Sequence, residues 1–462
     1  MFAGDRIIFC LLGLNWALPD HERNHFYPRD VSWYEVSKTE GRLYMISPYE
    51  TYHPDEGFLL DAMSNMDPAN LDFNPHFFNY PTLSIYLTGA VLKLGEMIGY
   101  VSAINSKAFY IENPDQIARV YLLGRSLVAV MSTLGVVALY FTAKLMFGRP
   151  TAFLSALTLA VMPLWVRNSH FMLVNVPSAT WMIACALFAV IAIKQNSHFS
   201  LAISAVLAGL ATSTRYLAGA IFILTAYAYF RLESKSWRLA ILLIGVAVFA
   251  FLLGTPYALI STEEFQRDLL FEGRTKFGII TPFHLLSLLA ISQSTLLLII
   301  TLISLLLVLL RVKRWQPQFL LLWLLAGMTQ RLISDADLAR YLIATLPPLA
   351  VFAGVALNKA RELIAGLNLR WSQAWGWALS LILLAPAIGY SLNIVWILQG
   401  TDVRNDVAGW LESHVTTDEP IGILGNLYYD MPPINADLYE IVNVAEMDLD
   451  HMPAVIVLTS EN

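Results

Sequence analysis

Long and nearly uninterrupted apolar runs constrain the fold of this chain more than any other sequence feature. Residues 239–253, 285–310 and 375–398 are each long enough, or nearly so, to cross a hydrocarbon layer about 30 Å thick. Hydrophobic residues make up 57% of the 462 residues, charged residues only 14%, and the mean hydropathy is +0.57. Soluble domains carry about 25% charged residues, so this composition indicates a polytopic membrane protein.

The apolar runs also predict the fold class. In hydrocarbon the backbone must satisfy its own polar groups, which only helices and closed barrels achieve. The runs are continuous rather than alternating in polarity, and this excludes a membrane β-barrel. We therefore predict an all-α polytopic membrane protein. A first span is expected at residues 7–18, which no small-residue cleavage site follows.

Charged loops predict the orientation of the chain. Alternate loops are basic and are assigned to the cytoplasm by the positive-inside rule, at residues 144–149, 194, 231–238, 311–314 and 359–361. The opposite, external set holds the loop around residue 55, residues 167–170, 212–216, 255–284 and 331–341, and the tail after residue 399. Residues 80–100, with Lys93 and Glu96, are predicted to form a juxtamembrane or re-entrant helix, because a span there would invert everything downstream. This arrangement predicts about eleven spans, a cytoplasmic N-terminus and an external C-terminus.

The domain organisation follows from the same pattern. Residues 1–398 are predicted to form the transmembrane domain, with residues 19–116 as an external first loop that carries juxtamembrane helices. Residues 399–462 are predicted to form a small extracytoplasmic α/β segment, with a helix at 403–414 and strands at 421–424 and 454–458. The two cysteines, Cys10 and Cys185, lie inside apolar runs and are interpreted as packing residues rather than as a disulfide or metal ligands.

The first external loop carries the acidic sequence His53-Pro54-Asp55-Glu56. A carboxylate can accept a proton from a hydroxyl within hydrogen-bond reach, and Asp55 is the candidate general base. Glu56 could hold a metal, orient Asp55 or raise the pKa of Asp55 by like-charge proximity, and the sequence does not choose between these roles. An exposed acidic turn without function is the competing interpretation. The aromatic and amide residues at 73–80 suit sugar stacking, although interfacial aromatic belts have a similar composition.

Arg215, Arg331 and Arg340 lie in segments predicted to be external. Guanidinium groups bind phosphate through two parallel hydrogen bonds, and a lipid phosphate would lie at about this depth. An arginine that snorkels to bulk lipid headgroups is the alternative for each of them. Three such residues on one face favour a dedicated phosphate site, and two of them, Arg331 and Arg340, flank a loop that contains Asp335 and Asp337.

Four histidines, at positions 53, 76, 170 and 284, fall in predicted external segments. A divalent metal held by histidine and carboxylate is one interpretation, with Glu56 and His170 as candidate ligands. No two of the four stand at a helical ligand spacing, so hydrogen-bonded structural histidines are favoured. No phosphate-binding glycine-rich loop or dinucleotide fingerprint is present, and no nucleic-acid partner is predicted.

In their order and spacing these motifs resemble the GT-C polyprenyl-phosphate-sugar-dependent glycosyltransferases. This group includes the protein O-mannosyltransferases of glycosyltransferase family 39 and the aminoarabinose transferases of lipid A. The acidic sequence at 53–56 resembles the motif of the first external loop in this group, and residues 74–76 and 80–83 resemble the segment that follows it. Further similar motifs stand at residues 169–171, 215–216, 254–257 and 340–341. The resemblance implies a GT-C type bundle of about eleven transmembrane helices.

The resemblance also implies an activity: transfer of a hexosyl or pentosyl group from a polyprenyl-phosphate carrier to an acceptor hydroxyl, with inversion, outside the plasma (inner) membrane. It implies that Asp55 is the catalytic base, that Glu56 supports it, and that Arg215 and Arg340 contact the donor phosphate. The predicted substrate- and phosphate-binding set is completed by His53, Tyr80, His170, Tyr216, Arg331 and Tyr341.

One position departs from the pattern of this group. Asn175 stands where relatives commonly carry an acid, and this puts in doubt any role that requires a charge there, including metal binding.

A transporter or flippase for an anionic lipid-linked substrate is the rival function. Transporters usually show internal repeats and broken helices near the membrane midplane, whereas the polar residues here concentrate on one predicted face. Phosphoethanolamine addition or oligosaccharide ligation is a second rival, but the former needs a large soluble metal domain that a tail of residues 399–462 is too short to form. The predicted partners are a polyprenyl-phosphate-linked sugar, membrane lipid and an acceptor protein, lipid or glycan.

Overall fold

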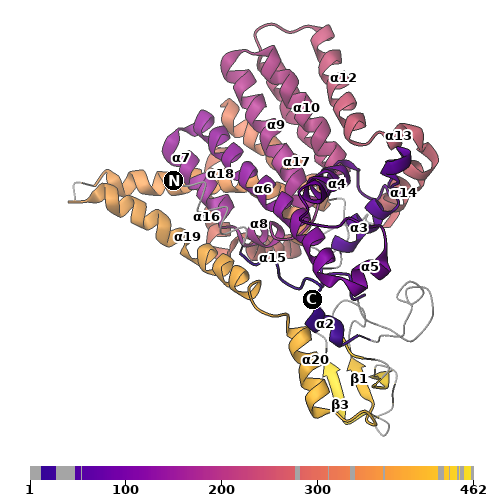
Figure 1. Cartoon of the computed structure of the whole chain (residues 1–462). Helices are drawn as coiled ribbons and strands as arrows, with labels where there is room; N and C mark the ends of the chain where they lie inside the picture. Colours follow the sequence, from indigo (N-terminus) through magenta and orange to yellow (C-terminus); the bar gives the residue numbers. More distant parts are fainter. Residues whose placement is uncertain are drawn as a thin grey trace. The chain divides into compact units, whose positions relative to one another are not determined.

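The computed structural model describes most of the chain, and the described residues are predominantly helical (Figure 1). They include three short strands. The described residues are 12–27, 47–53, 55–275, 281–310, 312–332, 339–367, 370–424, 431–435, 438–444, 447 and 452–458. Cys10, Pro54, Asp335 and Asp337 lie outside them, as does most of the span predicted at 7–18. The described part of that span, residues 12–18, forms turns rather than helix.

The chain divides into two compact units, and each is described by itself. The helical unit contains Asn65–Gly89 and Arg125–Trp396, and the loop–tail unit contains Leu12–Ser64, Ala90–Gly124 and Ile397–Asn462. Three of the boundaries fall inside helices: α4 (Leu83–Met97), α6 (Pro114–Phe147) and, at its last residue, α19 (Ser372–Ile397).

The helical unit is built from helices that follow one another after short connections. They are η1 (Pro68–Asn70), α4, α6, α7 (Arg149–Ala160), α8 (Pro163–Asn168), α9 (Asn175–Gln195), α10 (His198–Thr214), η2 (Tyr216–Ile221), α11 (Phe222–Arg231), α12 (Trp237–Gly254), α13 (Tyr257–Ile260), α14 (Thr262–Thr275), α15 (Pro282–Gln293), α16 (Thr295–Leu309), α17 (Trp315–Leu332), η3 (Ala339–Thr345), α18 (Leu346–Ala365) and α19 (Ser372–Ile397).

Within the described residues, five segments are long and apolar enough to cross a membrane: α6, α9, α12, η3 with α18, and α19. Helices α12 and α19 confirm that the apolar runs at 239–253 and 375–398 form helices. The run at 285–310 is not one straight span, because α15 and α16 meet at a bend of 112° and Ser294 takes a left-handed φ of 77° there. Counted as one span, this pair raises the number to six, and about eleven spans stays a prediction. Helix α4 has 15 residues, too short to cross about 30 Å of hydrocarbon at 1.5 Å per residue.

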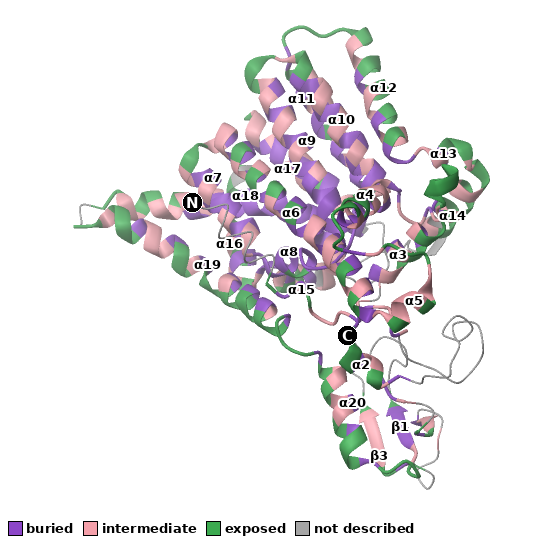
Figure 2. Cartoon of the chain, viewed as in Figure 1, coloured by how far each residue is buried: buried purple, intermediate pink, exposed green. Residues whose placement is uncertain are grey.

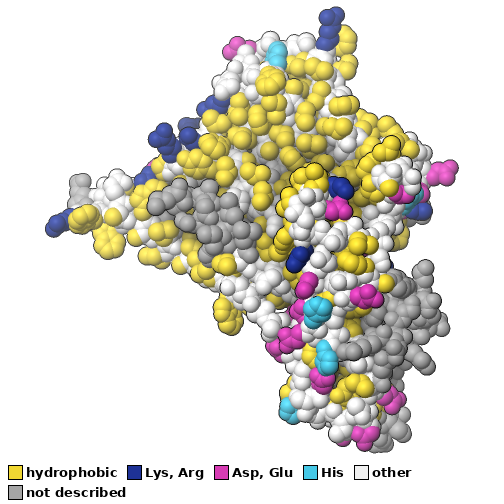
Figure 3. All heavy atoms as spheres, in the orientation of Figure 1, with side chains coloured by type: hydrophobic (Ala, Val, Ile, Leu, Met, Phe, Trp, Pro, Cys, Tyr) yellow, Lys and Arg dark blue, Asp and Glu magenta, His cyan; other side chains and the backbone are white. Residues whose placement is uncertain are grey.

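Helix α9 occupies the core of the helical unit and is buried along most of its length, whereas α12 exposes much of its surface (Figure 2). Apolar side chains cover the exposed surface of these helices (Figure 3), among them Ile241, Phe249 and Leu253 of α12. An apolar helix face that no protein covers is suited to lipid contact.

Glycines let α10 and α12 approach closely. A Cβ atom built at Gly209 would overlap the carbonyl oxygen of Ala247, and one built at Gly254 would overlap Oγ of Ser213. Small residues at such crossings are typical of helix packing in membranes, where close backbone contact supplies the attraction that hydrophobic burial supplies in water.

The loop–tail unit combines segments of the first loop with the C-terminal tail. Its elements within the described residues are α2 (His21–His25), α3 (Glu56–Ser64), α5 (Lys107–Glu112), α20 (Val403–His414), β1 (Ile421–Leu424), β2 (Ile441–Asn443) and β3 (Val455–Leu458). The strands form a parallel sheet in the order β2-β1-β3, in which Ile421 lies beside Ile441 and Val455. Helix α20, β1 and β3 confirm the helix and the two strands predicted for the tail, and β2 is an addition.

The small core of this unit joins the tail to the first loop. Tyr27 packs with Leu411 and Val415 of the tail helix region and with Ile421 and Ile423 of β1. A side chain from the first loop thus belongs to the core of the tail, so the two segments fold against each other.

Candidate active site

A hydrogen-bonded turn surrounds the two acids at the start of α3. Glu56 is fully buried, and its Oε2 accepts a hydrogen bond of 2.6 Å from the Thr51 hydroxyl. The backbone N–H of Glu56 donates to the His53 carbonyl oxygen over 3.2 Å. The backbone N–H of Asp55 donates to Nδ1 of His53, also over 3.2 Å, so this ring nitrogen carries no proton. The turn therefore fixes the tautomer of His53, with its proton on Nε2.

The two carboxylates of the turn stand in different surroundings. Asp55 is half-buried, while Glu56 is inaccessible to solvent and begins α3, where the helix dipole favours a negative charge. Three roles are open for Glu56. A buried acid that is bonded to Thr51 is best suited to orienting Asp55. Asp55 is the more exposed of the two acids.

In the helical unit, Arg340 is a common neighbour of two other arginines. Arg215 follows the last residue of α10 in an extended conformation, and its Nη1 donates to Oδ1 of Asn175 at the start of α9. Its guanidinium carbon lies 4.6 Å from the ring centroid of Tyr341, in η3. The third member is Arg167 in α8, and α8, α9 and η3 pack against one another. We call Arg167, Arg215 and Arg340 the arginine cluster.

Burial and mutual repulsion disfavour the positive charges of the arginine cluster. Burial lowers the pKa of Arg215 and the Arg340 charge adds to this, although the nearby hydroxyls of Tyr80 and Tyr341 and the Glu272 carboxylate act in the opposite direction. Desolvation and the Arg340 charge lower the pKa of Arg167, which keeps access to solvent. Arginine stays protonated in proteins. The cluster is therefore a concentration of positive charge that a bound anion would stabilise.

An amide, rather than an acid, contacts Arg215. Asn175 accepts a hydrogen bond from the guanidinium without cancelling its charge, whereas a carboxylate at the same position would form an ion pair. Asn175 itself therefore leaves the positive charge of Arg215 uncompensated.

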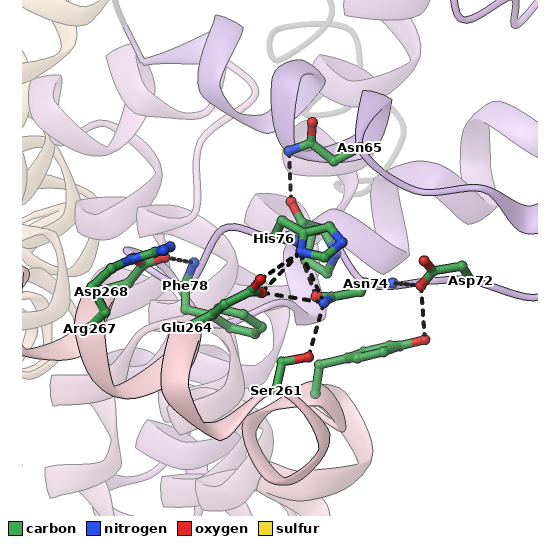
Figure 4. Close-up of polar contacts among 11 residues, drawn as sticks. Asn65, Asp72, Asn74, His76, Phe78, Ser261, Glu264, Arg267 and Asp268 are labelled. Atoms are coloured by element: carbon green, nitrogen blue, oxygen red, sulfur yellow. Dashed lines mark hydrogen bonds and ion pairs between the residues drawn. The ribbon is translucent and has the colours of Figure 1, made fainter.

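A network of polar contacts holds the segment that follows the acidic motif in the first loop against the residues that precede α14 and begin it (Figure 4). His76 Nδ1 lies 3.0 Å from both carboxylate oxygens of Glu264, and Nδ2 of Asn74 donates to Oγ of Ser261 over 3.0 Å. His76 has a left-handed φ of 49°, and its N–H donates to Oδ1 of Asn74 over 3.1 Å. Two segments far apart in the sequence, at 74–76 and 261–264, therefore meet, and His76 has a polar structural role.

The same segment continues into an aromatic contact. The N–H of Phe78 donates to Oδ2 of Asp268 over 2.9 Å (Figure 4), and its carbonyl oxygen accepts from the Tyr216 hydroxyl over 2.8 Å. The rings of Phe78 and Tyr216 both pack edge-on against Phe265, with centroids 5.8 and 6.1 Å apart. These contacts fix the chain two residues before Tyr80, which is the residue whose hydroxyl acts on Arg215.

The predicted site residues are thus placed in three ways. Tyr80, Arg215, Arg340 and Tyr341 are neighbours, and Tyr216 packs on Phe265. His53 belongs to the acidic turn of the loop–tail unit. The remaining two are buried: His170 donates from Nδ1 to the Val166 carbonyl oxygen over 2.7 Å, and Arg331 lies in the last turn of α17.

Sequence reasoning misses one member of the arginine cluster, Arg167. The signal that could have indicated it is its position two residues before the Ser169-His170-Phe171 motif. No group of three or more histidine, cysteine, aspartate or glutamate residues that could hold a metal ion is found in the part of the chain that the structure describes.

Comparison with known proteins identifies the fold. Residues 121–260 match the family model described as dolichyl-phosphate-mannose-protein mannosyltransferase, while no curated protein matches the chain. ArnT from Cupriavidus metallidurans in the apo state is 17% identical, with a TM-score of 0.52 over 85% of this chain and 81% of that chain. The same protein bound to undecaprenyl phosphate is 16% identical, with a TM-score of 0.54 over 96% of this chain and 87% of that chain.

A third similar structure comes from an archaeon. The oligosaccharyltransferase of Archaeoglobus fulgidus, tethered with an acceptor peptide, is 14% identical, with a TM-score of 0.51 over 94% of this chain and 64% of that chain. Together these similarities confirm the GT-C fold that the sequence motifs predict. With its apolar helices, the chain is a multi-pass membrane protein of this fold.

Proposed function

We propose that this protein is a membrane glycosyltransferase that moves a sugar from a polyprenyl-phosphate carrier to an acceptor hydroxyl on the extracytoplasmic face of the plasma membrane. The arginine cluster is the observation that carries the proposal, because neighbouring positive charges, with the amide of Asn175 accepting the hydrogen bond from Arg215, are suited to an anionic headgroup. The similarity in fold to an ArnT structure that holds undecaprenyl phosphate supports a lipid phosphate as that anion.

The proposed reaction is a direct displacement. Asp55 accepts the proton of the acceptor hydroxyl, and the hydroxyl oxygen forms a new bond to the anomeric carbon from the side opposite the carrier. The bond between the anomeric carbon and the carrier oxygen breaks, its electron pair leaves with the lipid phosphate, and the anomeric configuration inverts. Arg215, Arg340 and Arg167 stabilise the negative charge that develops on the phosphate.

The remaining residues position these groups. Glu56, bonded to Thr51, holds the turn from which Asp55 projects. Tyr80 and Tyr341 line Arg215 and give the sugar or the phosphate hydroxyl and aromatic contacts. No metal ion is required in this scheme, and we expect transfer to continue in the presence of a chelator.

A transporter or flippase for a lipid-linked anion is the second candidate, and one observation favours it. Helices α15 and α16 form a broken pair, bent by 112° at Ser294, and broken helices are typical of secondary transporters. Both candidates bind an anionic lipid, so only the fate of the sugar separates them.

The test is an incubation of the purified protein with radiolabelled polyprenyl-phosphate sugars and a membrane extract. The proposal predicts that label leaves the carrier and appears on a protein, lipid or glycan acceptor, with and without a chelator. A carrier that keeps all its label through the incubation, while being moved across vesicle membranes, would establish the transporter instead.

A further inference from the structure

The C-terminal tail contacts Tyr52, the residue that precedes the acidic motif. Tyr52 is almost fully buried, and its hydroxyl donates a short hydrogen bond of 2.5 Å to Oδ1 of Asn405. The guanidinium carbon of Arg404 lies 3.9 Å from the Tyr52 ring centroid, within the range of a strong cation–π contact. Two consecutive residues of the tail thus hold one side chain of the first loop.

Arg404 is itself fixed in place. Its Nε donates to Oδ1 of Asp402 over 2.6 Å and its Nη2 to Oδ2 over 2.7 Å, a two-pronged ion pair in which both side chains are largely buried. Oδ1 of Asp402 also accepts from the Arg404 backbone N–H over 2.9 Å, as the cap of α20. An arginine held at both prongs loses little further freedom when it stacks on a ring. The start of α20 is therefore a rigid surface for Tyr52.

A second arginine completes the arrangement from the first loop. Arg23 is 1% exposed, and its guanidinium carbon lies 4.3 Å from the Tyr52 ring centroid. Its Nη1 donates to the Glu50 carbonyl oxygen over 2.7 Å, and its Nη2 donates to the Tyr27 hydroxyl over 2.9 Å. Since Tyr27 belongs to the core of the tail, the backbone at residue 50 is also tied to the tail.

We propose that residues 402–405 of the tail form a clamp that positions the acidic turn, with Arg404 and Asn405 as positioning residues for Asp55. The clamp acts through Tyr52, which stands next to two members of the turn: Thr51, the partner of Glu56, and His53, the partner of the Asp55 N–H. This inference rests on the proposed function for its catalytic meaning. The segment thus gives the tail a role in catalysis without any contact with the substrate.

The chemistry of Tyr52 suits a permanent clamp rather than a switch. Burial raises the pKa of Tyr52 well above its ordinary value, so the hydroxyl keeps its proton and remains a donor to Asn405 at every physiological pH. Losing this bond would free the turn to rotate, and small displacements of a general base cost rate because proton transfer needs hydrogen-bond distance.

The test compares Tyr52→Phe, Asn405→Ala and the double variant in the full-length protein. A typical net hydrogen bond corresponds to a change of about 3- to 10-fold, so each single variant should lower kcat by that factor and leave KM for the carrier within about twofold. Because both variants remove the same bond, the double variant should be no slower than either single one. Backbone amides of residues 55–60 should also exchange with deuterium faster in all three.

A matched control removes the charge from a different contact of the same tail helix. Glu412 of α20 lies 2.9 Å from the ring of His25 in α2, and neither residue touches Tyr52 through a described contact. Glu412→Gln should therefore leave both kcat and the exchange of residues 55–60 unchanged.

The outcomes separate the clamp from the proposed function. If Asp55→Asn abolishes transfer but Tyr52→Phe and Asn405→Ala change neither kcat nor amide exchange, the clamp is overturned and the function stands. Equal losses in kcat for Glu412→Gln would also overturn it, because they would indicate general loosening of the tail. If Asp55→Asn transfers normally, the proposed catalytic role fails, and faster exchange in the Tyr52 and Asn405 variants would still support a clamp on the turn.

Discussion

Replacing Asn175 with aspartate should weaken binding of the lipid carrier more than any uncharged change at that position. The substitution keeps the size of the side chain and places a carboxylate oxygen where Oδ1 of Asn175 now accepts from Arg215. Arg215 would then be paired internally. A phosphate approaching the arginine cluster would meet a neutralised guanidinium and a new negative charge beside it.

The size of the effect follows from Coulomb's law. Two unit charges about 5 Å apart, with an effective dielectric constant of about 20, repel each other by about 3 kcal/mol, which corresponds to a loss of affinity of roughly 100-fold. Added salt should reduce the effect where the site is open to solvent. Asn175→Ala is the matched control: it removes the acceptor but leaves the guanidinium charged, so its affinity should stay within about threefold of wild type.

The assay is equilibrium binding of undecaprenyl phosphate to the purified variants in detergent, at low and high salt. Size-exclusion profiles and thermal unfolding establish that each variant is folded. A folded Asn175→Asp protein that binds the carrier as tightly as wild type would refute the assignment of the arginine cluster as the phosphate site.

Three further predictions concern the turn, the helix packing and the topology. Thr51→Val leaves a buried carboxylate without its hydroxyl donor and should lower the free energy of unfolding by about 1–3 kcal/mol, whereas Thr51→Ser should not; equal melting temperatures would contradict this. Gly254→Ala should destabilise by about 1–3 kcal/mol through overlap with Ser213, and adding Ser213→Ala should recover part of that loss; no recovery would refute the contact. A reporter fused after Arg314 should face the cytoplasm and one fused after Gln399 should not, so both on one side would break the predicted orientation.

The tail shows what local sequence patterns predict well. The amphipathic spacing at 403–414 and the β-branched runs at 421–424 and 454–458 predict α20, β1 and β3, because each pattern reports on a face that must be buried. Strand β2 is only three residues long, and so short a run carries no periodicity to detect.

Apolar composition is a weaker guide to the direction of a helix. The run at 285–310 is apolar on average but contains the polar residues Ser292-Gln293-Ser294-Thr295 near its middle, and hydropathy averaged over the run predicts one span there. The bend depends on the backbone of a single residue, Ser294, whose left-handed conformation separates α15 from α16. Hydropathy averaged over the whole run hides this short polar segment, which is the sequence signal that coincides with the break.

The sequence also predicts only part of the candidate site. The acidic motif and Arg215 are recognisable because short motifs place them, but their surroundings depend on residues distant in the sequence. Asn175 approaches Arg215 across 40 positions, and Asn405 approaches Tyr52 across 353. Neither pairing leaves a signal in a single sequence, and so the contact to Asn175 and the clamp become visible only in the folded chain.

The central claim is that Asp55 takes the acceptor proton while the arginine cluster holds the carrier phosphate. The most direct measurement compares wild type and Asp55→Asn for two quantities in the same preparation, the rate of label transfer and the affinity for undecaprenyl phosphate. Loss of the base should lower the transfer rate by about 100-fold or more and leave the affinity within about threefold. Transfer by folded Asp55→Asn at the wild-type rate would contradict the account.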